Sequence, residues 1–249
     1  MQSMIIAFAM FSKIPMPETD PEKGSGNYVY CWFPLIGIVI GAFELVLYHI
    51  MLLLGLGTLF RAAVLTAVPL LVTGGIHMDG FLDTVDARSS YGDWEKKLAV
   101  LKDPHVGAFA VIFGALYLIA YAGAWSEAGW RTLCVMAIYF AFERAVSGLA
   151  AVNFPQAGSG STLDFFTDSE LKKTVTDILL AETAALFIAM AVMWVPGAIA
   201  ALIVTAIIFV RYFLMSLKEF GGIRGDLAGW FLQSCELAVL ITLVVIEKI

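Results

Sequence analysis

Residues 177–217 read DILLAETAALFIAMAVMWVPGAIAALIVTAIIFVRYFLMSL, and this stretch decides the fold. Its charged residues are only Asp177, Glu182 and Arg211. A helix needs about 20 mostly apolar residues to cross a bilayer, and the runs 177–195 and 197–217 both have that length. Pro196 and Gly197 between them are typical of a tight turn. The stretch therefore predicts a hairpin of two transmembrane helices.

The same pattern recurs along the chain. Further apolar runs occupy 32–57, 60–76, 107–126, 131–152 and 227–247. None shows the apolar–polar alternation of a membrane β-strand. We therefore predict an all-α polytopic membrane protein with about seven transmembrane helices, preceded by a short interfacial or re-entrant helix at residues 4–11.

The composition supports this class. Of 249 residues, 60% are hydrophobic and 14% charged, and the mean hydropathy is +0.87. A soluble domain carries about 25% charged residues, so a soluble globular enzyme is excluded. We expect residues 1–249 to form a single membrane-embedded catalytic domain whose surroundings are the lipid bilayer. Homo-oligomers remain possible.

The basic residues predict the orientation. Ten of them lie in one set of alternate connections and three in the other: Lys13, Lys23, Arg88, Lys96, Lys97, Lys102, Lys172, Lys173, Lys218 and Arg224 against Arg61, Arg131 and Lys248. Because cytoplasmic loops are rich in Lys and Arg, the first set is expected in the cytoplasm, in a multi-pass protein of the cell membrane. The long connections lie on that side, so we expect the active site there. The net charge of −6 argues against nucleic acid as a partner.

The most informative polar stretch is TGGIHMDGFLDTVDARSSYGDWEKKLAVLKDPHVG, residues 73–107. Asp79, Asp83 and Asp86 follow the spacing i, i+4 and i+7, which places them on one face of a helix. Like charges on one helix face repel each other, and a divalent cation removes the repulsion. Oxygen ligands favour Mg²⁺, whose remaining ligands are often phosphate oxygens. The alternative is a solvated acidic face at a helix end.

Basic and histidine residues surround this cluster. Arg88 and Lys102 flank it and are candidates for holding phosphate, whereas His77 and His105 are candidates only for hydrogen bonding. Residues 93–102 have the pattern of an amphipathic helix on the membrane, with Asp93 as its N-cap. Lys96 and Lys97 on this helix are expected to face lipid headgroups rather than substrate.

A second polar element is GGIRGD, residues 221–226. Paired glycines let backbone N–H groups approach an anion, Arg224 adds a positive charge, and Asp226 adds a possible metal ligand. The alternative is a plain glycine-rich turn. Glu143, Arg144 and Glu236 lie inside predicted spans, where charged groups must be paired or face a polar cavity. The loop 153–166 is either a flap over the site or an ordinary connection.

The residues alone predict an enzyme that acts on a phosphate-bearing substrate. Three reaction classes fit a metal–carboxylate site: phosphodiester synthesis from a nucleotide-activated alcohol, prenyl transfer and phosphate hydrolysis. An ion-coupled transporter is the non-enzyme alternative. A transporter places its charges near the middle of the bilayer, whereas this acidic cluster lies at the end of a span.

Several motifs in order along nearly the whole chain resemble the cobalamin synthase family, the adenosylcobinamide-GDP ribazoletransferases. GGIHMDGFLDTVDA (74–87) is similar to its GGxHxDGxxDTxDG signature, and LKDPHVGAFA (101–110) to its KDxxxGxFG segment. GGIRGDLAGWFLQSCE (221–236) is similar to its GGxTGDxxGAxxExxE element. Residues 11–17 and 32–41 also resemble conserved blocks. The CDP-alcohol phosphotransferase motif does not match, because the GxxxDxxxD half is missing after Arg88.

The resemblance implies a reaction. The family transfers the phospho-corrinoid part of adenosylcobinamide-GDP to α-ribazole or α-ribazole 5′-phosphate, releases GMP, and depends on Mg²⁺. It implies Asp79, Asp83, Asp86 and Asp226 as metal ligands, with the first three and Lys102 catalytic. Substrate-binding candidates, from the resemblance and the reasoning above, are His77, Arg88, Asp103, Arg224 and Glu236. CDP-alcohol phosphotransferases and DxxxD prenyltransferases are the alternatives.

The chain departs from the family pattern at three positions. Ala87 stands where the family has Gly, Arg224 where it has Thr, and Gln233 where it has an acidic residue. Two of these positions lie near the expected site. They leave the carboxylate cluster intact but affect the expected contacts with the substrate.

Overall fold

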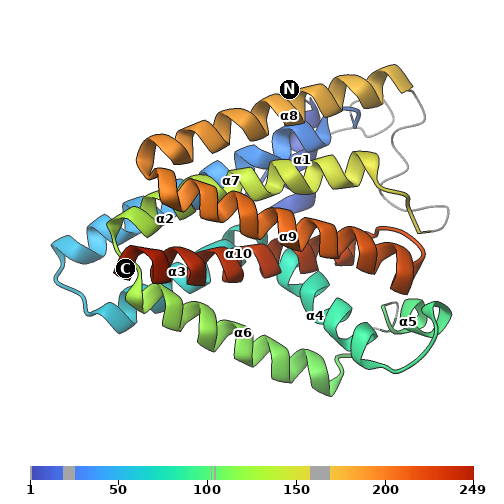
Figure 1. Ribbon diagram of the computed structural model, residues 1–249, viewed down its shortest axis with the longest axis horizontal. Coiled ribbons are helices and arrows are strands. Elements are labelled where there is room, and N and C mark those ends of the chain that lie inside the picture. The colour runs from blue at the N-terminus through green and yellow to red at the C-terminus, as the bar shows by residue number, and fades with distance from the viewer. Residues whose placement is uncertain (1, 19–25, 102, 104, 158–168) are drawn as a thin grey trace.

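The computed structural model describes residues 2–18, 26–101, 103, 105–157 and 169–249. Within these ranges the chain is all-α (Figure 1), and its one β-type contact is an isolated bridge between Gln156 and Ile223. The helices are α1 (Gln2–Phe11), the 3₁₀ turn η1 (Val29–Trp32), α2 (Phe33–Leu53), α3 (Thr58–Thr73), α4 (Ile76–Ser89), α5 (Trp94–Val100), α6 (Ala108–Glu127), α7 (Trp130–Asn153), α8 (Ser169–Met193), α9 (Val195–Phe220) and α10 (Gly225–Lys248).

The predicted polytopic membrane architecture is confirmed. Among the described residues, six helices are long and apolar enough to cross a membrane, and the number rises to seven if α3 and α4 together form one bent span. The predicted hairpin is present, since α8 ends at Met193 and α9 begins at Val195. The start of α8 was predicted at residue 177, eight residues too late. Its first turns carry Glu170, Lys172 and Lys173, which extend the helix beyond the apolar run that defined the prediction.

The second predicted span corresponds to the short helix α3, and the chain bends sharply between α3 and α4. The axes of α3 and α4 differ by 94°. The bend lies at Gly74 and Gly75, whose φ angles of 67° and 78° fall in the left-handed region that glycine adopts without steric cost. The bend redirects the chain, so that α4 leaves the direction of α3 and packs against α10.

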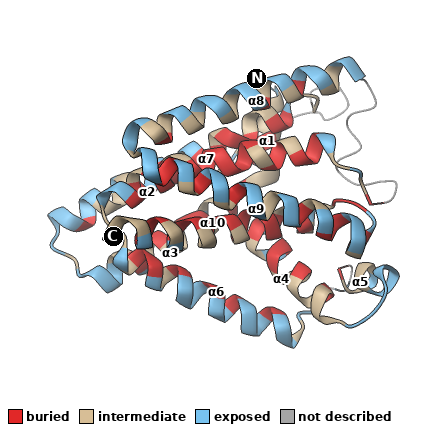
Figure 2. Ribbon diagram, viewed as in Figure 1, coloured by how far each residue is buried: buried red, intermediate tan, exposed pale blue. Residues whose placement is uncertain are grey.

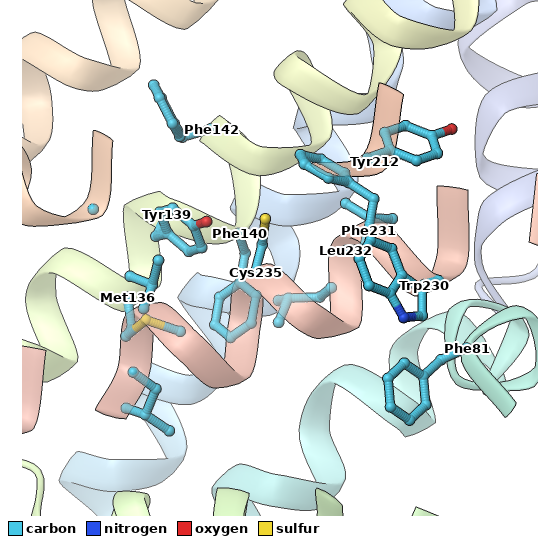
Figure 3. Close-up of a cluster of buried hydrophobic side chains, with 14 of the residues drawn as sticks. Phe81, Met136, Tyr139, Phe140, Phe142, Tyr212, Trp230, Phe231, Leu232 and Cys235 are labelled. Atoms are coloured by element: carbon cyan, nitrogen blue, oxygen red, sulfur yellow. The ribbon is translucent and has the colours of Figure 1, made fainter. Parts of the chain in front are cut away.

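Helix α7 is the centre of the bundle. It packs against α2, α8, α9 and α10 and is buried along most of its length, whereas α6 and α8 expose broad apolar faces (Figure 2). Aromatic residues fill the space between α7, α9 and α10, with Tyr139 and Phe140 at one end of the cluster and Tyr212 and Phe231 at the other (Figure 3). Apolar side chains on the outer helices are the expected surface of a protein solvated by lipid.

A group of buried charges lies within this core. The Arg144 Nη1 atom is 2.7 Å from Glu143 Oε1, and its Nη2 atom is 3.5 Å from Glu236 Oε1. Gln233 Nε2 donates to the other oxygen of Glu236, and the fully buried Glu44 acts on the same group from α2. The sequence left open whether Glu143 and Arg144 are paired or face a polar cavity, and the structure shows that they form an ion pair. The ion pairs and hydrogen bonds link α7 and α10 at the middle of the bundle, and Glu44 of α2 has no hydrogen-bond partner among the described residues.

We predict that Arg144→Met destabilises the protein strongly. The variant leaves Glu143 and Glu236 buried without a positive partner, and removal of one member of a buried pair costs about 3–5 kcal/mol. The measurement is reversible unfolding in mixed detergent micelles. Arg131→Met, at an exposed position at the start of α7, is the matched control and is expected to unfold like the wild type. Equal stability of the two variants would contradict the assigned role of Arg144.

Candidate functional site

The site is assembled by a close contact between α4 and α10. A Cβ atom on Gly80 would lie 2.8 Å from the carbonyl oxygen of Asp226, and one on Gly229 would lie 2.6 Å from that of His77. Only glycine allows two helix backbones to approach so closely. The first turns of the two helices therefore cross, and Asp79 and Asp226 come to lie at two adjoining helix N-termini, where the helix dipoles favour negative groups, phosphate included.

Three carboxylates at this crossing lack neutralising partners. Within the described ranges, the side chains of Asp79, Asp83 and Asp226 form no ion pair and accept no hydrogen bond. The negative charges of Asp79 and Asp226 both act on Asp83, and Arg224 partly offsets the charge of Asp226. Excess negative charge that is left unpaired at a helix crossing fits a bound cation.

The donor set fits magnesium in a particular way. No three His, Cys, Asp or Glu side chains of the described chain converge closely enough to enclose a metal ion. Mg²⁺ does not need such a cage, because it is commonly held by one or two carboxylates with water and substrate phosphate as the other ligands. Asp79, Asp83 and Asp226 suit that arrangement.

Asp86 lies on the same helix but makes different contacts. Its Oδ2 atom accepts a hydrogen bond from the backbone N–H of Gly107 at 2.6 Å, and its Oδ1 atom accepts one from Ala110 at 2.9 Å. Both carboxylate oxygens therefore cap the N-terminus of α6. This contact fixes the connection that leads from α4 through α5 to α6, a role that the sequence did not reveal.

A cavity of about 260 Å³ begins beside the carboxylates. It is lined by α1, η1, α2, α4, α7, α9 and α10: Met10, Phe11, Tyr30, Phe33, Ile76, His77, Asp79, Ser147, Ala151, Tyr212, Ile223, Gly225, Asp226, Ala228 and Leu232. Asp79 is exposed whereas Phe33 and Tyr212 are buried, so the cavity runs from the surface into the core. His77 is buried in its wall, and its Nε2 atom has no partner among the described residues.

Lys13, one of the basic residues that predict the orientation in the membrane, lies near the site. Its backbone N–H donates to the Val72 carbonyl, and its side chain covers Gly74 at the bend between α3 and α4. Lys13 and Asp79 line the same surface pocket. Lys13 falls within residues 11–17, which resemble a block of the family. This resemblance is the feature of the sequence that could have indicated a position near the site.

Two other predicted residues lie away from the carboxylates. Arg88 pairs with Glu219 at 3.3 Å and its guanidinium lies 5.9 Å from the centre of the Trp230 ring, in a pocket that Asp79 and Asp226 do not line. Glu236 is buried in the Arg144 network and does not line the cavity that Asp79 lines. A role for either residue in substrate binding stays a prediction.

The connection between α4 and α6 is partly as predicted. Asp93 caps α5 through a 3.0 Å bond from the Lys96 N–H, which confirms the predicted N-cap. The interpretation of Lys97 as a headgroup ligand was wrong, because its ammonium lies 2.6 Å from Glu219 Oε2.

At the end of this connection, Asp103 is exposed and bonds to His105. Hydrogen bonds from the backbone and the ring of His105 lower the pKa of Asp103. Lys102 lies outside the described residues, as do residues 158–166 of the loop that was considered as a flap.

Comparisons with known proteins agree on one family. Residues 3–244 match the family described as Cobalamin-5-phosphate synthase. A protein of Lachnoclostridium phytofermentans named adenosylcobinamide-GDP ribazoletransferase is 40% identical over 249 residues, covering 100% of this chain and 95% of the relative. One of the same name from Clostridium perfringens is 31% identical, covering 97% of this chain and 96% of the relative. No solved structure matches the chain.

We predict that Gly229→Ala lowers activity at least about tenfold while the protein remains folded in the membrane. The added methyl group pushes α10 away from the His77 carbonyl, and displacements of about 1 Å at a reactive centre are costly. The readout is turnover per folded molecule. Gly123→Ala on α6 is the matched control, since its Cβ would meet nothing within 4 Å. Equal activity of the two variants would show that the close crossing is not required.

We also predict that Asp86→Ala lowers stability whereas Asp79→Ala does not. Asp86→Ala removes the cap of α6 and is expected to cost about 1–2 kcal/mol. Asp79→Ala relieves repulsion without removing a hydrogen bond and is expected to leave stability unchanged or to raise it. Thermal unfolding without added metal measures both. A loss of stability on Asp79→Ala equal to that on Asp86→Ala would contradict these roles.

Proposed function

The chain belongs to the cobalamin-5-phosphate synthase family, and we propose that the crossing of α4 and α10 is the active site of its adenosylcobinamide-GDP ribazoletransferase activity. The enzyme transfers the phospho-corrinoid part of adenosylcobinamide-GDP to α-ribazole or its 5′-phosphate and releases GMP. This step completes the nucleotide loop of cobalamin. The observation that carries the assignment of the site is a set of three carboxylates without ion pairs among the described residues: Asp79 and Asp226 in the first turns of α4 and α10, and Asp83 one turn further along α4.

The chemistry of the step matches this set. A hydroxyl of α-ribazole attacks the phosphorus atom next to cobinamide, the bond to the GMP oxygen breaks, and the hydroxyl proton leaves. Asp79, Asp83 and Asp226 would supply the one or two carboxylate ligands of Mg²⁺, and the ion would neutralise the diphosphate and the departing phosphate. Asp86 belongs to the proposed site as the residue that positions α6 rather than as a metal ligand.

The remaining residues at the crossing bind and orient the substrates. Arg224, at the N-cap of α10, has a buried Nε atom with no partner among the described residues and supplies a guanidinium next to Asp226. Lys13 lines the same surface pocket as Asp79. Two cations beside a carboxylate cluster suit a substrate whose phosphates bind both the metal and the protein.

The proposed site lies on the cytoplasmic side of the cell membrane. Residues 154–157 and 221–224 and helix α5 lie at one end of the bundle, and the tight turns lie at the other (Figure 1). The first end carries the excess of Lys and Arg, which supports a cytoplasmic position. A soluble GDP-activated corrinoid or ribazole phosphate would reach the carboxylates from that side.

We predict that Asp83→Ala lowers transfer at least about a hundredfold while the protein still inserts and folds, because the phosphates lose their neutralising ion. The assay incubates the purified protein with adenosylcobinamide-GDP, α-ribazole and Mg²⁺ and measures GMP release. Chelation of the metal with EDTA is expected to stop the wild-type reaction, and added Mg²⁺ to restore it.

The control for this prediction is Asp93→Ala, which removes an exposed carboxylate at the α5 N-cap and leaves the three site carboxylates in place. Unchanged turnover of Asp83→Ala would overturn the metal assignment. Turnover of CDP-alcohols or prenyl diphosphates in place of adenosylcobinamide-GDP would overturn the proposed substrate.

A further inference from the structure

The cavity behind the carboxylates is the right size for one part of one substrate. Its volume is about 260 Å³, which is far too small for a corrin ring or for a whole nucleoside diphosphate. A fused bicyclic ring of about ten atoms is of the right order, since a single water molecule occupies about 30 Å³ in the liquid. Three bicyclic bases take part in the proposed reaction, namely the benzimidazole of α-ribazole, the guanine of GDP and the adenine of the adenosyl group.

The chemistry of the walls distinguishes these three bases. The rings of Phe11 and Phe33 lie 4.5 Å apart along one side, and Tyr212 is buried on another. Aromatic walls suit a flat ring. Guanine and adenine both carry several donors and acceptors on their edges, and burying these groups without partners is costly. The dimethylbenzimidazole ring of α-ribazole is apolar except for one unsubstituted ring nitrogen.

His77 provides a partner for that nitrogen. Its imidazole is 6% exposed, packs edge-on against Phe33 with ring centroids 5.6 Å apart, and has an Nε2 atom without a partner among the described residues. A buried polar atom in a native protein normally has a partner. An imidazole with its proton on Nε2 donates one hydrogen bond. The benzimidazole has one acceptor for it, the unsubstituted ring nitrogen.

We propose that this cavity binds the benzimidazole base of α-ribazole, with His77 donating to its free ring nitrogen and the ribose at the mouth beside Asp79 and Asp226. The inference rests on the proposed function and assigns its acceptor subsite. The adenosylcobinamide-GDP then lies outside the cavity, over the carboxylates. The cavity walls select the base, whereas the carboxylates serve the transfer.

The test changes the size of the cavity without touching the carboxylates. Ala151→Leu on α7 adds three carbon atoms to the wall. The assay compares kcat/KM for the riboside of dimethylbenzimidazole with that for the riboside of unsubstituted benzimidazole, using full-length protein in nanodiscs. One methylene group more or less in an apolar pocket changes the relative kcat/KM of two substrates about 10-fold or more. In Ala151→Leu we therefore expect the ratio of kcat/KM for the dimethylbenzimidazole riboside to that for the benzimidazole riboside to fall at least about tenfold. The KM for adenosylcobinamide-GDP stays within about twofold of its wild-type value.

Two further variants separate selectivity from misfolding. Ala184→Leu on the exposed face of α8 is the matched control and keeps the wild-type ratio. Met10→Ala widens the cavity from α1 and is expected to shift the ratio the opposite way, toward the bulkier riboside. An unchanged ratio in both cavity variants, whatever their total activity, overturns the assignment of the cavity.

Equilibrium binding separates this proposal from the proposed function. Wild-type protein is titrated with the riboside alone and with GMP alone, following the fluorescence of the benzimidazole and competition by GMP. Riboside binding that Ala151→Leu weakens at least tenfold supports the subsite even if no transfer is detected, in which case the proposed function fails. If Ala151→Leu abolishes GMP binding and leaves riboside binding unchanged, the cavity binds guanine and the proposal is overturned.

Discussion

The site depends on one steric constraint, the contact of two helix backbones at Gly80 and Gly229. This contact brings together residues 79 and 226, which are far apart in the sequence, because the carbonyls of His77 and Asp226 occupy the space where side chains would be. The carboxylates therefore need no attraction to each other in order to meet. Packing of the backbones holds like charges together, and their repulsion is what a cation and a phosphate would relieve.

The bundle sorts its polar groups by depth. Inside it, the charge of Arg144 is paired with Glu143 and Glu236, which offsets the cost of burying it, whereas Glu44 nearby has no hydrogen-bond partner among the described residues. At the α4–α10 crossing, Asp79, Asp83 and Asp226 remain without ion pairs within the described ranges. Both groups attach to α10, so the buried pair fixes the helix that carries Asp226. Stability and chemistry are thus served by different charges on one helix.

The sequence predicted what depends on local pattern. Seven apolar runs and the spacing of Asp79, Asp83 and Asp86 define helices by composition and periodicity, and both were found. It did not predict partners that come from distant segments. Asp86 caps α6 across 21 positions, and Lys97 meets Glu219 across 122. Carboxylates on one helix look alike in the sequence, and only the packing of α6 distinguishes Asp86 from its neighbours.

The cavity shows why catalysis and base selection can vary independently. The carboxylates lie on α4 and α10, whereas Met10 and Ala151 line the cavity from α1 and α7. Neither α1 nor α7 contributes a carboxylate to the crossing, so a change of wall volume alters which base fits without altering the charges that act on the phosphates. A cavity built from residues 10 to 232 leaves no local signature in the sequence. The carboxylate motif therefore points to the reaction. In the proposed subsite, the benzimidazole base of α-ribazole is selected by side chains that are dispersed along the chain.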